Sequence, residues 1–163
     1  MIDRFQGFVE NHLDCFERFL IIGHVTGSAL ILDNPGERVL LTHHKKLGRW
    51  LQPGGHADGD DDVKRVAMKE AREESGLESL EFHQVGLLDV DIHTIPARMD
   101  EPEHEHYDCR FLLRSAGSDE FVVSNESHDL SWVQMDKITN YTDEESILRM
   151  IRKAKRILAL SVN

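Results

Sequence analysis

The chain has 163 residues, of which 40% are hydrophobic and 30% are charged, a composition typical of one soluble globular domain. Its formal net charge of −11 at pH 7 argues against nucleic acid as a partner, because phosphate binding needs clustered Lys and Arg. Cys15 and Cys109 are too few for a disulfide framework, so we expect a reducing, cytoplasmic location. The amino-terminal segment contains acids and no uninterrupted apolar run, so we expect neither a signal peptide nor membrane association.

Residues 3–20 form the first predicted element, an amphipathic helix. Its apolar residues lie near helical spacing: Phe5, Phe8, Leu13, Phe16 and Leu20. We interpret them as core or docking surface, and we predict a single domain over 1–163 with a helical extension at about 1–20. This extension covers a sheet edge or contributes to a homodimer contact, and the sequence leaves both alternatives open.

A hairpin is predicted after the extension, from strands at 24–32 and 38–43 around an Asp-Asn-Pro-Gly turn. It feeds a loop that ends in Gly54 and Gly55, where small residues let the backbone approach a ligand closely. Arg49 lies in this loop. Its guanidinium either contacts phosphate or is solvated, and both interpretations stay open.

The next predicted element is a helix over 62–75, with Gly76 as its carboxy-terminal stop. Acidic residues at its start suit the positive end of the helix dipole. On a helical wheel of about 100° per residue, most apolar residues share one side, which should face a core. The basic residues fall on the flank and the back, where water is expected: Lys64, Arg65, Lys69 and Arg72.

Three glutamates of this helix do not join its basic side. On the wheel, Glu70 and Glu74 project from the middle of the apolar stripe, and Glu73 sits at its edge. Inward carboxylates are costly without a positive partner, and acids within one turn repel each other. A divalent cation resolves both problems, and clustered oxygen ligands suit magnesium or manganese. The alternative is three solvated glutamates, but the solvated face is already occupied by Lys and Arg.

From Gly55 to Leu77 the chain resembles the Nudix box of the Nudix hydrolase family, G-x5-E-x7-R-E-U-x-E-E-x-G-U, where U is aliphatic. The spacing is intact, but Asp61 stands where the family has Glu, and Lys69 stands where it has Arg. In the family these two positions support each other. The resemblance therefore implies an Asp61–Lys69 contact that is shorter or water-bridged, because Lys lacks the two-pronged guanidinium.

The resemblance implies the Nudix fold, an α/β domain whose mixed β-sheet is sandwiched between α-helices. It also implies a Mg2+ cofactor, with Mn2+ as a substitute, and a nucleotide or other diphosphate as the small-molecule partner. The implied metal ligands are the Gly55 carbonyl, Glu70, Glu73 and Glu74. The implied catalytic residues are Glu70, Glu73 and Glu105, and the implied substrate-binding residues are Arg49, Gly54 and Gly55.

The choice of Glu105 rests on a polar loop predicted at 96–105, because in the family a glutamate from a comparable region binds metal or activates water. Glu101 and Glu103 are the other candidates, and Glu105 is favoured because it adjoins a strand. His104 and His106 share one face of an extended segment. Together with Asp108 they either bind zinc or another transition metal, or they are ordinary solvated or hydrogen-bonded histidines.

The remaining elements follow from apolar patterns and turn signals. The predicted strands are 80–95 (one long or two short), 106–113 with an extension at 120–123, and 130–135. A capping box at Thr142 precedes the final amphipathic helix, which we expect to reach residue 158.

The predicted function is metal-dependent hydrolysis of the diphosphate linkage in a nucleoside diphosphate linked to another moiety. Two alternatives come from other classes. One is a catalytically weak or inactive nucleotide-binding or regulatory module, suggested by the departures at Asp61 and Lys69. The other is an isoprenoid-diphosphate isomerase, for which the sequence offers no suitably placed cysteine nucleophile or acid pair.

Overall fold

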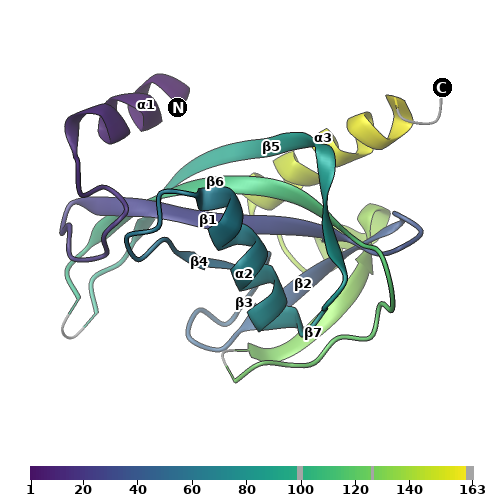
Figure 1. Cartoon of the computed structure of the whole chain (residues 1–163). Helices are drawn as coiled ribbons and strands as arrows, with labels where there is room; N and C mark the ends of the chain where they lie inside the picture. Colours follow the sequence, from purple (N-terminus) through teal and green to yellow (C-terminus); the bar gives the residue numbers. More distant parts are fainter. Residues whose placement is uncertain (99–100, 126, 161–163) are drawn as a thin grey trace.

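A computed structural model describes residues 1–98, 101–125 and 127–160 of the chain. Within these residues, seven strands form one sheet, and three α-helices and one 3-10 helix surround it (Figure 1). The elements are α1 (Ile2–Asn11), β1 (Gly23–Leu32), β2 (Arg38–His44), β3 (Arg49–Leu51), β4 (Gly54–His56), α2 (Val63–Ser75), β5 (Leu80–Ile95), β6 (His104–Ser115), β7 (Ser127–Gln134), η1 (Met135–Asn140) and α3 (Glu145–Leu160).

The sheet has the order β3-β2-β1-β6-β5, with β4 paired to β1 and β7 paired to β2. Strands β1 and β6 run parallel, and the other pairs run antiparallel. In Figure 1, α2 crosses in front of the sheet and α3 lies behind it. The predicted α/β architecture, a mixed sheet between helices, is therefore confirmed.

Alternate residues of β1 build the two faces of the sheet, because successive side chains of a strand point to opposite sides. Ala29 and Ile31 pack with Ala67 and Ala71 of α2. Gly27 lies so close to α2 that a Cβ there would stand 2.8 Å from the Val63 carbonyl oxygen. On the other face, a second core joins β1 to η1 and α3 through Leu30, Leu32, Ile138, Ile147, Met150 and Ile151.

The α3 side of the sheet also holds a row of buried polar side chains. Asp108 on β6 accepts hydrogen bonds from the Thr26 hydroxyl at 3.1 Å and from the Ser28 hydroxyl at 2.8 Å. The Nε of Arg110 donates to the same carboxylate at 2.7 Å. Burial of these groups is tolerable because each carboxylate oxygen has a donor.

The helix predicted at 3–20 is wrong beyond Asn11. The chain turns extended at His12 (φ −131°, ψ 103°) and continues in turns, in which Cys15 N donates to His12 O. The Cys15 carbonyl then accepts from Val25 N of β1 at 2.7 Å, so tertiary pairing replaces the helical pattern. Phe8 still docks as expected, stacked on Tyr107 with ring centroids 3.8 Å apart.

The predicted ends of α2 are confirmed. The Asp62 side chain accepts from Arg65 N at its start, and Gly76 ends it in a left-handed conformation with φ 69°. By contrast, the helix after Thr142 begins only at Glu145. The Thr142 hydroxyl accepts from Glu144 N at 3.2 Å instead of capping the helix.

Several strand boundaries differ from the prediction. Strand β6 begins at His104, so the predicted loop is shorter, and its residues 99 and 100 lie outside the described residues. Residues 120–123 are not a strand, although Val122 N donates to Ser75 O at 2.7 Å and ties this segment to α2. Strands β3 and β4 occupy the segment that was expected to be a loop, and β7 begins three residues before its predicted start.

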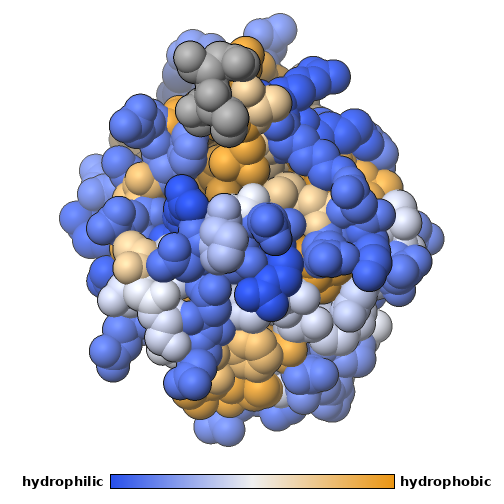
Figure 2. All heavy atoms as spheres, turned by 90° about the vertical axis from the view of Figure 1, so that its right-hand side faces the viewer, coloured by the Kyte–Doolittle hydropathy of each residue, from blue (hydrophilic) through white to orange (hydrophobic). Residues whose placement is uncertain are grey.

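Polar side chains cover most of the face shown in Figure 2, and the apolar residues there lie in separate patches. Among the described residues, no helix is both long enough and apolar enough to cross a membrane.

Candidate functional site

Two glutamates of α2 converge on the Gly54–Gly55 backbone of β4. Glu74 is buried, with 7% of its surface exposed, and its Oε1 accepts from Gly54 N at 2.7 Å. The Glu70 side chain is 17% exposed and lies against Gly55, where an added Cβ would stand 2.6 Å from its Cδ. Glycine at position 55 is therefore what allows the Glu70 carboxylate to approach the backbone.

The third glutamate lies farther out. The Glu73 side chain is 60% exposed, and Lys69 stands between it and Glu70. Lys69 Nζ donates to Glu70 Oε1 at 3.3 Å and lies 3.8 Å from Glu73 Oε2. The hydrogen bond and charge of Glu70, with the charge of Glu73, raise the pKa of Lys69 above its ordinary value.

This donor set fits a hard divalent cation. It consists of carboxylate oxygens from one helix face and the backbone of two glycines, and oxygen donors are the ligands that Mg2+ and Mn2+ prefer. In the structure, the Lys69 ammonium supplies positive charge to two of the acids. A cation bound to Glu70 would therefore compete with Lys69 for the same carboxylate.

The implied Asp61–Lys69 contact is not a direct ion pair among the residues that the structure describes. Lys69 pairs with Glu70 and Glu73, and Asp61 is exposed. The start of α2 is held instead by Arg65, whose Nε donates to Asp60 Oδ2 at 2.7 Å. The contacts that join α2 to its preceding loop thus use Asp60 and Asp62. They do not use Asp61, the acid at the position that the family pattern assigns.

Arg49 lies at the start of β3, exposed, and its guanidinium pairs with Glu144 just before α3. Its neighbour Trp50 stacks on His43 with centroids 5.0 Å apart, and its indole also meets the ring of Tyr141 edge-on. These contacts tie the β2–β3 hairpin to the segment that leads into α3.

The predicted loop glutamates separate in space. Glu105, on β6, accepts hydrogen bonds from Arg4 of α1 and, at 3.1 Å, from the Tyr107 hydroxyl. Glu101 is exposed and lies 3.9 Å from His104 Nε2. The pKa of Arg18 is raised mainly by a hydrogen bond to Asp58, and the charges of Glu101 and Glu70 contribute further.

The structure also brings together histidines that the sequence pattern did not connect. His24 of β1 and His56 of β4 lie beside His106 of β6, and their ring centroids are 4.9 to 5.0 Å apart. A strand period of two links only His104 with His106 in the sequence. The pairing of β1 with both β4 and β6 adds the other two rings.

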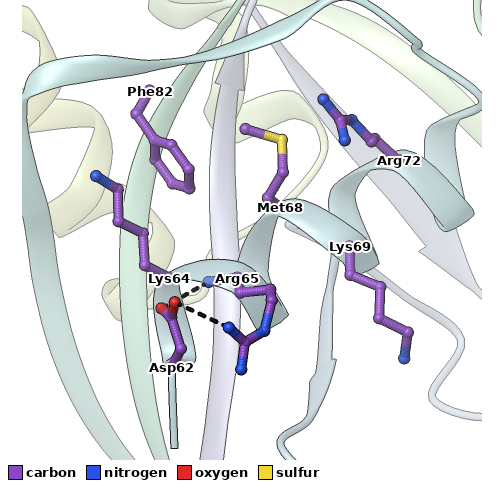
Figure 3. A pocket seen from close by; sticks show the side chains of 7 residues that line it. All are labelled: Asp62, Lys64, Arg65, Met68, Lys69, Arg72 and Phe82. Atoms are coloured by element: carbon purple, nitrogen blue, oxygen red, sulfur yellow. Dashed lines mark hydrogen bonds and ion pairs between the residues drawn. The ribbon is translucent and has the colours of Figure 1, made fainter. Parts of the chain in front are cut away.

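A hollow of about 330 Å³ lies on the outer side of α2, against β5 (Figure 3). Met68 and Phe82 form its apolar part, and the Lys64 ammonium lies 4.4 Å from the centre of the Phe82 ring. Its rim carries the basic side chains that were predicted to face water: Lys64, Arg65, Lys69 and Arg72. None of the three α2 glutamates lines this hollow, but it borders the carboxylate site through Lys69, which pairs with Glu70 and Glu73.

Residues 23–154 match the family model of the NUDIX domain. A C. elegans Ap4A hydrolase in a binary complex is similar at 20% identity and a TM-score of 0.68, covering 83% of this chain and 97% of that one. A NUDIX-family hydrolase from Clostridium perfringens is similar at 28% identity and a TM-score of 0.63, with the same coverage. The E. coli dihydroneopterin triphosphate pyrophosphohydrolase is similar at 16% identity and a TM-score of 0.62, covering 79% and 92%.

No curated protein matches the chain. The family model nevertheless spans well over half of the sequence and includes the whole of the α2 segment and its glycine loop. The structural match covers 97% of the C. elegans chain and 97% of the Clostridium perfringens chain, so this chain shares their fold over nearly the full length of both. The chain therefore belongs to the Nudix family.

Proposed function

We propose that the chain is a Mg2+-dependent hydrolase that cleaves the diphosphate linkage of a nucleoside diphosphate joined to another moiety, with Mn2+ as a substitute ion. The observation that carries this proposal is the convergence of Glu70 and Glu74 on the Gly54–Gly55 backbone. Carboxylates gathered at the backbone of a short strand suit a cation that is shared with a diphosphate. A cytoplasmic location and a homodimer remain predictions.

In this proposal, Glu70, Glu73, Glu74 and the Gly55 carbonyl hold the ion. When bound, the ion supplies charge neutralisation at the diphosphate and polarises a P–O bond. Gly54 N positions the Glu74 carboxylate through its 2.7 Å hydrogen bond to Oε1. Arg49 is proposed to contact a substrate phosphate, which requires its guanidinium to leave Glu144.

A carboxylate must accept the proton of the attacking water. The candidates are Glu70, Glu73 and Glu105. Glu105 needs release from Arg4 and Tyr107 before it can act, because both donate to its carboxylate.

The substrate class is supported by the names of similar structures, which include an Ap4A hydrolase and a pyrophosphohydrolase of a pterin triphosphate. Each of those molecules contains linked phosphates attached to a heterocycle-bearing group. At 16 to 20% identity this support extends to the class of linkage and not to the choice of base or leaving group.

The test is to replace Glu73 and Glu74 separately by Gln and to assay both variants on a panel of substrates with Mg2+ or Mn2+. The panel contains nucleoside triphosphates, ADP-ribose, dinucleotides and sugar nucleotides. Each change keeps side-chain size but removes a ligand charge, so we expect turnover to fall about 10²–10³-fold. Glu78→Gln is the matched control, because Glu78 is exposed just after α2.

The proposal is refuted if both folded variants retain wild-type turnover. A nucleotide-binding module without catalysis is the second candidate, favoured by one observation, that Lys69 pairs with Glu70 and has no direct ion pair to Asp61. Tight binding of nucleotides without turnover across the whole panel would support this module. The isomerase is disfavoured, since burial and the charge of Asp108 raise the pKa of the Cys109 thiol to about 12 and suppress its thiolate.

A further inference from the structure

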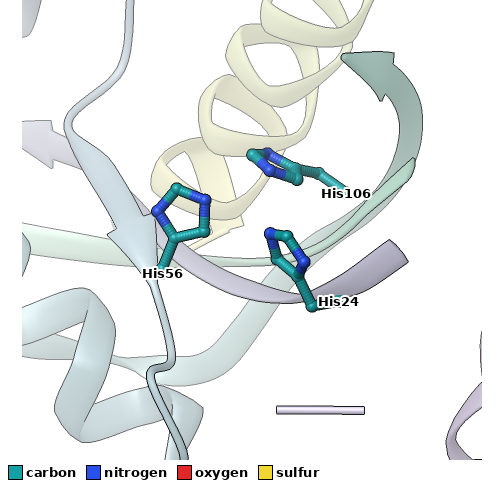
Figure 4. Close-up of side chains that lie close together, drawn as sticks. All are labelled: His24, His56 and His106. Atoms are coloured by element: carbon teal, nitrogen blue, oxygen red, sulfur yellow. The ribbon is translucent and has the colours of Figure 1, made fainter. Parts of the chain in front are cut away.

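Three histidines from different strands point their rings toward one another on the α3 side of the sheet (Figure 4). They are His24 of β1, His56 of β4 and His106 of β6, and one ring nitrogen of each lies within 4.8 Å of the others. The sheet register explains the cluster. His24 is the direct partner of His106, and His56 is the direct partner of Thr26 on the same face of β1.

His24 is unusual within this cluster because it is 2% exposed and neither of its ring nitrogens has a hydrogen-bond partner among the described residues. A buried polar group without a partner costs about 1–3 kcal/mol. Such groups are rare in native proteins and point to something that satisfies them. An ion at the centre of the three rings would accept the lone pair of His24.

A fourth ring, that of His104, lies beside this cluster. His104 Nδ1 lies 2.9 Å from the Pro102 carbonyl oxygen, so Nδ1 carries the proton and Nε2 presents its lone pair. That Nε2 lies 3.3 Å from His106 Nε2. In a tetrahedral zinc site with Zn–N bonds of about 2.0–2.1 Å, neighbouring ligand nitrogens are about 3.3–3.4 Å apart. A backbone carbonyl that holds the other ring nitrogen is also the usual support of a metal-bound histidine.

The chemistry of the cluster favours a cation over an anion, because imidazole nitrogens bind metal ions through their lone pairs. Glu101, 3.9 Å from His104, adds negative charge beside the cluster.

We propose that His24, His56 and His106 bind one transition-metal ion of the zinc class, with His104 or a water molecule in the fourth position. Imidazole nitrogen suits zinc, whereas the carboxylates of α2 suit magnesium, so the two sites select different ions. This site does not depend on the hydrolase proposal, because it uses no α2 residue. It gives the chain a second kind of cation centre on the opposite face of the sheet.

The experiment is a titration of the metal-stripped full-length protein with Co2+ in excess Mg2+, followed by visible absorbance, and with Zn2+, followed by calorimetry. Co2+ reports coordination by its spectrum and needs no enzymatic activity. We expect one equivalent to bind, and His56→Asn and His106→Asn each to weaken binding by at least about 10–100-fold. His128→Asn is the matched control, because His128 is exposed on β7 and should leave binding unchanged.

The variant Glu74→Gln distinguishes the two cation sites experimentally. It should leave Co2+ binding at the histidines intact while it removes the proposed Mg2+-dependent activity. Zn2+ should also raise the melting temperature of the wild type and of His128→Asn, but not that of His56→Asn. His56 is only partly buried, so this variant tests the site even if replacement of a more buried ring prevents folding. The inference is overturned if the wild type binds neither ion stoichiometrically, or if binding survives both histidine changes.

Discussion

Arg110→Met should be among the most destabilising single changes in this chain. The Arg110 side chain is 3% exposed and lies among three carboxylates on the α3 side of the sheet. Its Nε donates to Asp108 at 2.7 Å, its Nη2 donates to Asp91 at 3.1 Å, and Asp89 lies 3.9 Å away. Methionine fills much of the same volume but removes the charge, so the acids are left with fewer partners.

The cost can be assigned by counting the cations that remain. Arg149 of α3 still reaches Asp89 at 2.6 Å and Asp91 at 2.8 Å, and Lys153 of α3 still reaches Asp89 at 2.7 Å. Asp108 loses its ion pair and keeps only the hydroxyls of Thr26 and Ser28. One uncompensated buried carboxylate corresponds to about 3–5 kcal/mol. At about 2–4 °C per kcal/mol for a domain of this size, the melting temperature should fall by about 6–20 °C.

The effect also has a predicted pH dependence. Burial by itself raises the pKa of Asp91, but His93, Arg110 and Arg149 outweigh burial and hold this pKa well below its ordinary value. A lowered folded-state pKa stabilises the protein above the unfolded-state pKa of about 3.9, and the stabilisation is lost as the pH falls. The difference between wild type and Arg110→Met should therefore be largest near pH 7 and shrink below about pH 4.

Thermal and urea unfolding followed by circular dichroism measure this difference. Arg114→Met is the matched control, because Arg114 is exposed on the same strand and donates only to the Asn34 carbonyl. Its cost should stay within about 1 kcal/mol. Equal losses in the two variants, or an Arg110→Met protein as stable as the wild type, would refute the idea that a buried charge is being left unpaired.

Two further changes test the glycine loop and a buried turn. Gly55→Ala would place a Cβ 2.6 Å from the Glu70 Cδ and should raise the Mg2+ concentration needed for half-maximal activity about 10–100-fold. Its control is Gly7→Ala, whose added Cβ meets open space in α1. A Mg2+ titration of activity that is unchanged in Gly55→Ala would contradict the expectation. Asp33→Asn should cost about 1–3 kcal/mol at pH 7, because the buried Asp33 accepts from three backbone N–H groups and from Arg38 Nε. These bonds outweigh burial and lower the pKa of Asp33, so the cost should shrink as the pH falls from about 5 towards 2, and a pH-independent cost in urea unfolding would exclude this cause.

Local chemistry explains why α2 was predictable. An aspartate cap and a terminal glycine flank a helix with a regular apolar stripe, and each of these signals acts over only a few residues. The wheel placed Glu70 and Glu74 in the middle of the apolar stripe and Glu73 at its edge. In the structure Glu74 is buried and Glu70 is mostly covered, whereas Glu73 is exposed to solvent. The wheel could not predict the hydrogen-bond partner of Glu74, because the Gly54 N–H that donates to it belongs to strand β4.

Non-local pairing explains what the sequence did not predict. The turns after Asn11 are stabilised by a hydrogen bond to β1. The apolar spacing of residues 12–20 carries no information about this contact with a separate strand. The histidine cluster likewise depends on β1 and β6 running side by side, and a parallel pair needs a long connection between its strands. Only His104 and His106, which share one strand, could be related from spacing alone.

Strand β4 connects the two proposed cation sites. Gly55 is opposite Gly27 and faces α2, where Glu70 lies, whereas His56 is opposite Thr26 and faces the histidine cluster. Because neighbouring residues of a strand point to opposite faces, one three-residue strand contributes to both sites without their ligands meeting. A change of the His56 side chain can therefore remove zinc ligation and leave the Gly55 backbone in place, which is why metal binding and Mg2+ dependence should respond separately.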